Sequence, residues 1–295
     1  MQSKTIKCMN ISTVYHGFAL QHQDLNKELV KQVMDTVPLE KLYLLGLAVT
    51  HRRIETLFSV PSVTCRTPSH YWLLALVADN HDNSLNNLQD KIEQHLYSLL
   101  PATAIVLTVS QFLEWAKTGH PFAVSVQEKG FVLFEKSAAI LSPAKIKNLQ
   151  ELAKENGQLF EQTKIKVREF LAGAELFVMR VQYKMAAFML HQAAEQAMRT
   201  MLIINTGLRL NTHSIDRLLR CCALFCYRLP DLFPRQTNKE KVLFQLLQKA
   251  YIETRYRNDY SIKLDQLIAV NRQVQKLYEL FLKGSPVNSS NYPAA

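Results

Sequence analysis

The first half of the chain alternates between helix-like and strand-like patterns of apolar residues. The stretch NKELVKQVMDTV (residues 26–37) has apolar residues at helical spacing, and Pro38 closes it. Residues 85–100 have the pattern of an amphipathic helix. Three short apolar runs are suited to buried strands: residues 41–49, 70–78 and 103–109. A last strand is expected in GFVLFE (residues 130–135), so this half predicts a small α/β domain with a mixed sheet.

The second half is almost entirely helical in pattern. Five long segments repeat apolar residues at helical spacing: residues 149–172, 176–204, 214–227, 239–257 and 264–282. Two of the breaks, NTGLRLNTH (residues 205–213) and LPDLFPRQTN (residues 229–238), are rich in turn-forming residues. Helices joined by short connections favour an antiparallel bundle. The predicted fold class is therefore α+β, with an α/β domain followed by an all-α bundle.

These patterns predict a division of the chain into four parts. The parts are an α/β domain at residues 1–140, a helical linker at 141–157, a helical bundle at 158–284 and a disordered tail at 285–295. The tail is assigned from its polar sequence, GSPVNSSNYPAA.

Composition favours a helix-rich cytoplasmic protein. The chain has 295 residues, of which 48% are hydrophobic and only 8 are glycine. No apolar run approaches about 18 residues, so we expect no membrane span, and the first ten residues lack the apolar core of a signal peptide. Five scattered cysteines suggest no disulfide framework and suit a reducing compartment.

Charge is distributed unequally between the two halves. Residues 1–140 hold 12 Lys and Arg against 12 Asp and Glu, whereas residues 141–295 hold 23 against 13. The second half therefore accounts for the whole net charge of +10. A basic half suggests an anionic partner such as a nucleotide or RNA, and a solvated positive surface is an equal alternative.

Three ordered stretches of the second half resemble the HEPN domain, a helical bundle found in prokaryotic toxins and RNases. They are AAFMLHQAAEQAMRTMLI (residues 186–203), THSIDRLLR (residues 212–220) and LLQKAYIETRYRNDYSI (residues 246–262). The resemblance implies nucleotide or RNA binding and a homodimer formed through this domain. It also implies metal-independent RNase activity in many members, and a defence or toxin–antitoxin-like role.

The first half resembles the minimal nucleotidyltransferase domain that often precedes HEPN. Gly46 stands where this family opens its phosphate-binding turn, and GFVLFE is similar to the family's closing strand. The family's two metal-binding carboxylates would occupy positions 70 and 72, which hold His70 and Trp72, and the next strand carries no third carboxylate. Because nucleotidyl transfer needs carboxylates to hold divalent metal, we expect that this activity is lost. Core packing is the favoured role for Tyr71 and Trp72.

The HEPN RNase motif is also incomplete in this sequence. The family places a histidine shortly after an arginine, but the corresponding positions after Arg255 and Arg257 hold no histidine. We therefore predict non-catalytic binding, with no catalytic residue, metal or cofactor. Two alternatives remain open. One is an RNase that uses Lys263 or Tyr260 instead of histidine, and the other is a pure oligomerisation scaffold.

Five residues are the candidate ligand contacts: Arg255, Arg257, Tyr260, Lys263 and His213. Guanidinium groups and aromatic rings suit phosphate and base contacts. Arg255 and Arg257 point about 200° apart on a regular helix, so they can share a pocket only if the helix ends between them. The polar residues of the LHQAAE stretch, His191, Gln192 and Glu195, are expected to satisfy one another inside the bundle. The three cysteines of CCALFC (residues 221–226) are expected to be core thiols.

Overall fold

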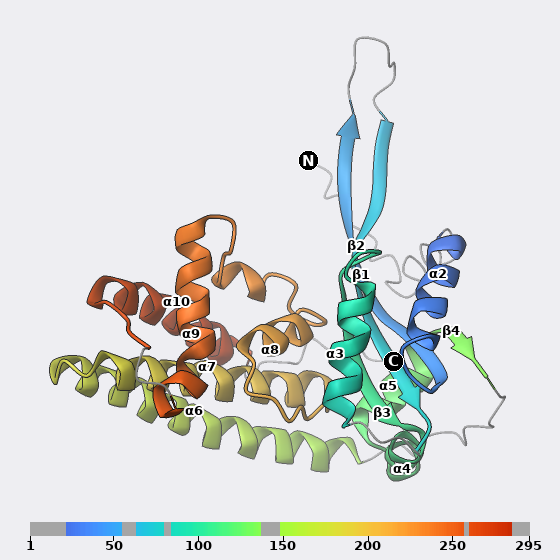
Figure 1. The fold of residues 1–295 in the computed structure, drawn as a ribbon. Coiled ribbons are helices and arrows are strands. Elements are labelled where there is room, and N and C mark those ends of the chain that lie inside the picture. The colour runs from blue at the N-terminus through green and yellow to red at the C-terminus, as the bar shows by residue number, and fades with distance from the viewer. Residues whose placement is uncertain (1–21, 55–62, 80–83, 137–147, 257–259, 285–295) are drawn as a thin grey trace, which may run out of the picture. The chain divides into compact units, whose positions relative to one another are not determined.

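The chain forms two compact units, residues 1–146 and 147–295. The structure, a computed structural model, describes residues 22–54, 63–79, 84–136, 148–256 and 260–284 (Figure 1). The first unit is built on a sheet and the second is helical, which confirms the predicted α+β class. The predicted tail and residues 141–147 of the predicted linker lie outside the described residues.

Unit 1 contains a four-stranded mixed sheet. The strands are β1 (Leu39–Ile54), β2 (Val63–Val77), β3 (Ala102–Thr108) and β4 (Phe131–Glu135), in the spatial order β3-β2-β1-β4. β1 is antiparallel to both β2 and β4, whereas β2 and β3 are parallel. Parallel pairing of β2 and β3 requires a crossover connection, which the helix α3 (Leu85–Leu96) supplies.

Two strands are longer than their apolar runs predicted. β1 and β2 continue their pairing to Ile54 and Val63, so they form a ribbon that extends beyond the sheet (Figure 1). The extension consists mainly of polar residues, and the expectation that strands end with the apolar run was therefore wrong. In this ribbon each strand pairs with one neighbour, so only the backbone groups on the shared edge are bonded within the sheet.

Helices cover both faces of the sheet. Alternate residues of β2, including Tyr71 and Leu73, belong to a core with α3 and α2 (Gln23–Met34). On the opposite face Tyr43 contacts Phe112 of α4 (Val109–Thr118), with 6.1 Å between ring centroids. The last helix of unit 1 along the chain is α5 (Pro121–Lys129). The sequence pattern did not predict α4 and α5, because both are short.

Unit 2 is a bundle centred on one helix. Its helices are α6 (Leu149–Met179), α7 (Tyr183–Thr206), α8 (Ile215–Cys222), α9 (Asn238–Tyr256) and α10 (Leu264–Lys283), with the 3₁₀ turn η1 (Leu229–Leu232). α7 packs against α6, α8, α9 and α10. The sequence therefore predicted all five helices of the bundle.

The boundaries of three of these helices differ from the prediction, and one of them is α7, which begins at Tyr183 rather than at residue 176. α6 runs without interruption to Met179, so the expected break after residue 172 was wrong. Gly173 stays within the helix, where it lies against Met189, and the burial of Leu171 and Ala174 continues across it. α8 ends at Cys222 rather than near residue 227.

Candidate functional site

One face of α7 carries polar side chains into the interior of unit 2. His191, Glu195 and Arg199 are spaced by four residues and therefore lie on one side of the helix. His191 and Glu195 are buried, with exposed fractions of 0% and 1%. Buried polar groups need partners, and those of this face come from the connection between α7 and α8 and from α9.

Glu195 is the centre of the hydrogen-bond network on this face. Nδ1 of His213 lies 3.2 and 3.1 Å from Oε1 and Oε2 of Glu195, and Gln192 Nε2 donates to Oε2 at 3.3 Å. Arg199 Nε lies 3.1 Å from Oε1, close enough for an ion pair but without the alignment of a hydrogen bond. A carboxylate accepts only, so the proton between His213 and Glu195 belongs to Nδ1.

The backbone that carries His213 is fixed by the same face. Nε2 of His191 donates to the carbonyl of His213 at 3.1 Å, and the guanidinium of Arg199 donates to the carbonyl of Thr212. Ser214 then begins α8, because its hydroxyl accepts from the N–H of Arg217 at 3.2 Å. Three consecutive residues are thus held in place before the helix starts.

Tyr251 of α9 completes the arrangement. Its ring stacks on the imidazole of His213, with 3.9 Å between centroids and 14° between planes. The Tyr251 hydroxyl lies 3.1 Å from Nε2 of His213, and because the rings are nearly parallel this contact is a weak hydrogen bond. The side chain of His213 is 46% exposed. We call His191, Glu195, Arg199, His213 and Tyr251 the His213 cluster, which reaches solvent at His213.

The sequence anticipated only part of this cluster. The expected mutual satisfaction of His191, Gln192 and Glu195 is confirmed, with 3.4 Å between Gln192 Nε2 and His191 Nδ1 and 3.3 Å between Gln192 Nε2 and Glu195 Oε2. Arg199 and Tyr251 were missed, although both lie within the motifs that suggested the HEPN resemblance. Their participation depends on the approach of α9 to α7, which no local pattern reports.

The other candidate contacts are placed differently. The described part of α9 extends to Tyr256, and the Arg255 side chain and all of Arg257 lie outside what the structure describes. Tyr260 is buried at 4% exposure, and its hydroxyl donates to the carbonyl of Leu246 at 2.9 Å. Burial raises the pKa of Tyr260, and Glu253 adds to this rise. This environment favours a structural role for Tyr260.

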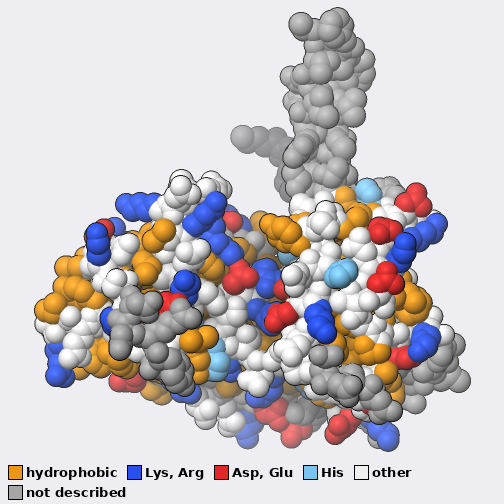
Figure 2. Space-filling view, viewed as in Figure 1, with side chains coloured by type: hydrophobic (Ala, Val, Ile, Leu, Met, Phe, Trp, Pro, Cys, Tyr) orange, Lys and Arg blue, Asp and Glu red, His pale blue; other side chains and the backbone are white. Residues whose placement is uncertain are grey.

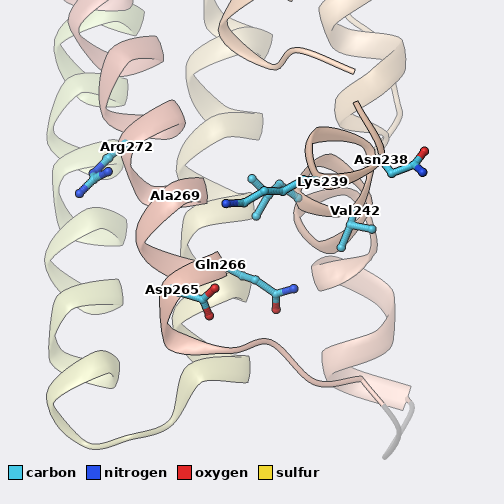
Figure 3. A pocket seen from close by; sticks show the side chains of 8 residues that line it. Asn238, Lys239, Val242, Asp265, Gln266, Ala269 and Arg272 are labelled. Carbon is cyan, nitrogen blue, oxygen red and sulfur yellow. The ribbon is translucent and has the colours of Figure 1, made fainter. Parts of the chain in front are cut away.

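Lys263 comes two residues before Asp265, the first residue of α10 that lines a hollow between α9 and α10. It is the residue before α10, it is exposed, and its backbone N–H donates to Gln266 Oε1 at 3.0 Å. The hollow, of about 460 Å³, is lined by Asn238, Lys239, Val242, Leu243, Asp265, Gln266, Ala269 and Arg272. Figure 3 shows Lys239 and Arg272 on two of its sides. Asp265 also lines it, so its charge is mixed. Among the described residues, the hydrogen bond of Lys263 is with Gln266, and none connects it to the His213 cluster.

In unit 1 the structure groups the residues at the expected carboxylate positions. His70 and Trp72 are neighbours on one face of β2, with 4.6 Å between ring centroids. Nε2 of His70 lies 2.8 Å from the hydroxyl of Thr103 on β3, which pairs with Trp72. Tyr71, on the opposite face, is fully buried and donates to Asn26 Oδ1 at 3.1 Å, and burial raises its pKa to about 12. The core role of Tyr71 is confirmed, and Trp72 is half-buried.

Two of the three cysteines expected in the core lie there, whereas Cys226, beyond the end of α8, is only partly buried. Cys221 and Cys222 are fully buried, and burial raises the pKa of the Cys222 thiol. Within the described ranges, no cluster of three or more His, Cys, Asp or Glu side chains could hold a metal ion. No described helix has both the length and the apolar character needed to cross a membrane.

Residues 160–284 match the model of a protein family described as the HEPN domain. The match spans 125 of the 295 residues and includes α7 to α10, the His213 cluster and all three sequence stretches that resemble this family. A HEPN domain points to a function related to nucleotides or RNA. No curated protein matches the chain. The family match does not extend to unit 1, whose resemblance to nucleotidyltransferases stays a prediction.

Proposed function

We propose that the HEPN domain at residues 160–284 binds a nucleotide or single-stranded RNA at the surface around His213, without cleaving it. The observation that carries this proposal is the half-exposed imidazole of His213, held by Glu195 and stacked on Tyr251. Paired aromatic rings at a surface suit base stacking, and a rigid imidazole suits a phosphate contact.

Charge and helix geometry support the same surface. Position 255 lies one helical turn beyond Tyr251 on α9, so its backbone is on the same side of the helix. A guanidinium suits phosphate contacts, which makes Arg255 the residue to test. The net charge of +10 belongs to the second half of the chain, and Figure 2 shows Lys and Arg side chains over several parts of the visible face. We therefore expect binding that weakens as salt increases.

Substituting Arg255 with lysine should weaken RNA binding about 10-fold, because Lys cannot copy the bidentate contact of a guanidinium with phosphate. The measurement is fluorescence anisotropy of a short labelled single-stranded RNA at two salt concentrations. The matched control is Arg272→Lys, an exposed arginine in the hollow between α9 and α10, which should change binding by less than about 2-fold. The reverse ranking would place the ligand in that hollow and contradict the proposal.

A second candidate function is RNA cleavage with His213 as the general base. It is favoured by the contact between Glu195 and Nδ1, which leaves Nε2 as the nitrogen with a lone pair. In that reaction Nε2 takes the proton of a ribose 2′-hydroxyl, the oxygen attacks phosphorus, and the 5′-oxygen leaves with a proton from solvent. The products are a 2′,3′-cyclic phosphate and a 5′-hydroxyl.

Incubation of the full chain with labelled RNA separates the two functions. Binding with intact RNA supports the first candidate, whereas cyclic-phosphate products that disappear with His213→Asn support the second. Products that persist with His213→Asn would show a contaminating nuclease. The burial of Tyr260 and the hydrogen bond of its hydroxyl to the backbone favour His213 over Tyr260 for this chemistry.

For unit 1 we propose a nucleotidyltransferase-like domain that has lost its activity. The support is the mixed sheet together with His70, Trp72 and Thr103, which occupy one face where the family would place metal-binding carboxylates. We expect no transfer of nucleotide to protein or small molecule with any nucleoside triphosphate and Mg²⁺ or Mn²⁺. The double substitution His70→Asp, Trp72→Asp should not restore it, since Thr103 supplies no third carboxylate. Metal-dependent labelling by the natural chain would contradict this.

A further inference from the structure

The paired strands β1 and β2 extend beyond the sheet of unit 1 as a two-stranded ribbon. The ribbon consists of residues 49–54 of β1 and residues 63–68 of β2, which pair one to one. β3 pairs with β2 only from Tyr71 onward, and β4 pairs with β1 only at residues 41–44. Among the described residues, therefore, no third strand flanks the ribbon, and both of its outer edges lack a strand partner.

The dimensions of the ribbon suit the groove of a double helix. Figure 1 shows the ribbon continuing past the sheet and past the helices α2 and α3 beside it. Six residues of a strand span roughly 20 Å, and paired strands lie about 5 Å apart. The major groove of B-form DNA is about 12 Å wide and admits a two-stranded ribbon. The deep major groove of A-form RNA is too narrow for side chains to read.

The ribbon is the positive part of a neutral region. Its cations are Arg52, Arg53 and Arg66, and the one acidic residue between residues 42 and 78 is Glu55, which lies outside the described residues. The other carboxylates that make residues 1–140 neutral come before or after this stretch of sequence. A local group of positive charges attracts an anionic partner even where the net charge is zero.

The register places most of these cations together. Paired residues share a face and successive residues alternate between faces, so His51, Arg53 and Arg66 lie on one face of the ribbon. Arg53 pairs with Thr64, and Arg66 pairs with His51, so the two arginines are diagonal neighbours. Like charges at neighbouring positions repel, and a phosphate shared between them removes that cost. The N–H groups of the outer edges are further donors for phosphate oxygens.

A second role for charged residues on a ribbon is to stop its edges from pairing with other proteins. Repulsion of this kind works with charges of either sign. The described part of the ribbon contains three arginines and no Asp or Glu, so its charge is of one sign. This bias favours a phosphate backbone as the partner over an extended peptide.

We propose that the β1–β2 ribbon enters the major groove of duplex DNA and contacts its phosphates. The surface belongs to unit 1, and it depends neither on the ligand of the HEPN domain nor on nucleotidyl transfer. Duplex DNA is the probe for the ribbon, whereas single-stranded RNA is the probe for the surface around His213. Either proposal can therefore fail while the other stands.

Fluorescence anisotropy of the full chain with a labelled DNA duplex of about 30 base pairs tests the ribbon, at salt concentrations from about 50 to about 200 mM. The triple substitution Arg52→Gln, Arg53→Gln, Arg66→Gln should weaken binding at least about 10-fold at the lowest salt. It should also reduce the slope of log K against log salt by about 3, because three phosphate contacts are lost. Its affinity for single-stranded RNA should not change.

The matched control removes the same charge from other parts of unit 1. Lys31→Gln, Lys91→Gln, Lys117→Gln alters exposed residues of α2, α3 and α4. This control should change DNA binding by less than about 3-fold and leave the salt slope unchanged.

A lysine version of the ribbon separates charge from folding. Arg52→Lys, Arg53→Lys, Arg66→Lys keeps the three positive charges, so it should keep the salt slope and lose less than about 3-fold in affinity. Circular dichroism of all three variants should match that of the natural chain, because the sheet and helices of unit 1 do not include the substituted ribbon positions.

Three results would overturn the proposal. The first is a natural chain that does not bind duplex DNA at about 50 mM salt. The second is an equal loss of binding in the glutamine variant of the ribbon and in the lysine-to-glutamine control, because the charge would then act without a site. The third is duplex RNA of the same sequence binding as tightly as the DNA, because the contact would then not require the wider groove.

Discussion

Replacing Glu195 with alanine should lower the free energy of unfolding of unit 2 by about 3 kcal/mol. The carboxylate is 1% exposed and is the shared acceptor for His213 and Gln192 and the ion-pair partner of Arg199. Its loss leaves these donors facing one another without an acceptor. The side chains of Arg199 and His213 are 27% and 46% exposed, so water can replace part of what they lose and the effect should fall below the upper range for buried pairs.

Thermal and urea unfolding followed by circular dichroism at 222 nm measures this effect, because the helices of unit 2 dominate that signal. The matched control is Glu161→Ala, which removes an exposed ion pair with Lys164 and should cost no more than about 0.5 kcal/mol. Glu195→Gln should fall between the two, since its amide oxygen can still accept from His213. If Glu195→Ala were as stable as the control, the His213 cluster would not contribute to stability. Glu195→Ala should also weaken RNA binding, because Glu195 positions His213.

Replacing Phe281 with alanine should cost about 4 kcal/mol. Phe281 is 1% exposed, and its ring stacks on Phe160 of α6 with 4.7 Å between centroids. It also lies near Tyr278, whose hydroxyl donates to the carbonyl of Lys164 at 3.3 Å. The stacked pair joins Phe160, at the start of the HEPN match, to the last turn of α10, near the end of that match. Truncation leaves a cavity at the point where the first and last helices of the bundle meet.

The neighbouring residue provides the control for Phe281. Leu282 is 36% exposed, so Leu282→Ala should cost less than about 1 kcal/mol in the same unfolding experiment. Phe281→Leu should cost less than Phe281→Ala, because it fills part of the cavity. Equal costs for Phe281→Ala and Leu282→Ala would show that α6 and α10 are not held together by this stacked pair.

Predictions from the sequence were most reliable where a periodic pattern of apolar residues extended over a long segment. The five helices of the bundle and the strands of the sheet were found because burial of one face imposes a repeat of 3.6 or 2 residues. The same reasoning failed for α4 and α5, which are too short to show a repeat, and for the ribbon ends of β1 and β2. It also divided α6 at Gly173, where contacts with α7 outweigh the modest cost of a glycine within a helix.

The residue types of the candidate site were visible in the sequence, but their assembly was not. His213 is separated from Glu195 by 18 residues and from Tyr251 by 38, and the packing of α9 against α7 brings them together. Tyr260 was expected to contact a ligand at the surface. The fold instead buries its side chain, and its hydroxyl donates to the Leu246 carbonyl.

The sequence by itself determined that a neutral α/β unit precedes a basic helical bundle, since charge and periodicity are properties of the chain alone. It also determined that the expected carboxylates and RNase histidine are absent. Only the tertiary structure decided which polar residues are buried, which imidazole reaches solvent, and which strands continue as a ribbon beyond the sheet. The physical reason is that burial is set by neighbours distant in sequence, whereas a periodic pattern shows only that a face will be buried.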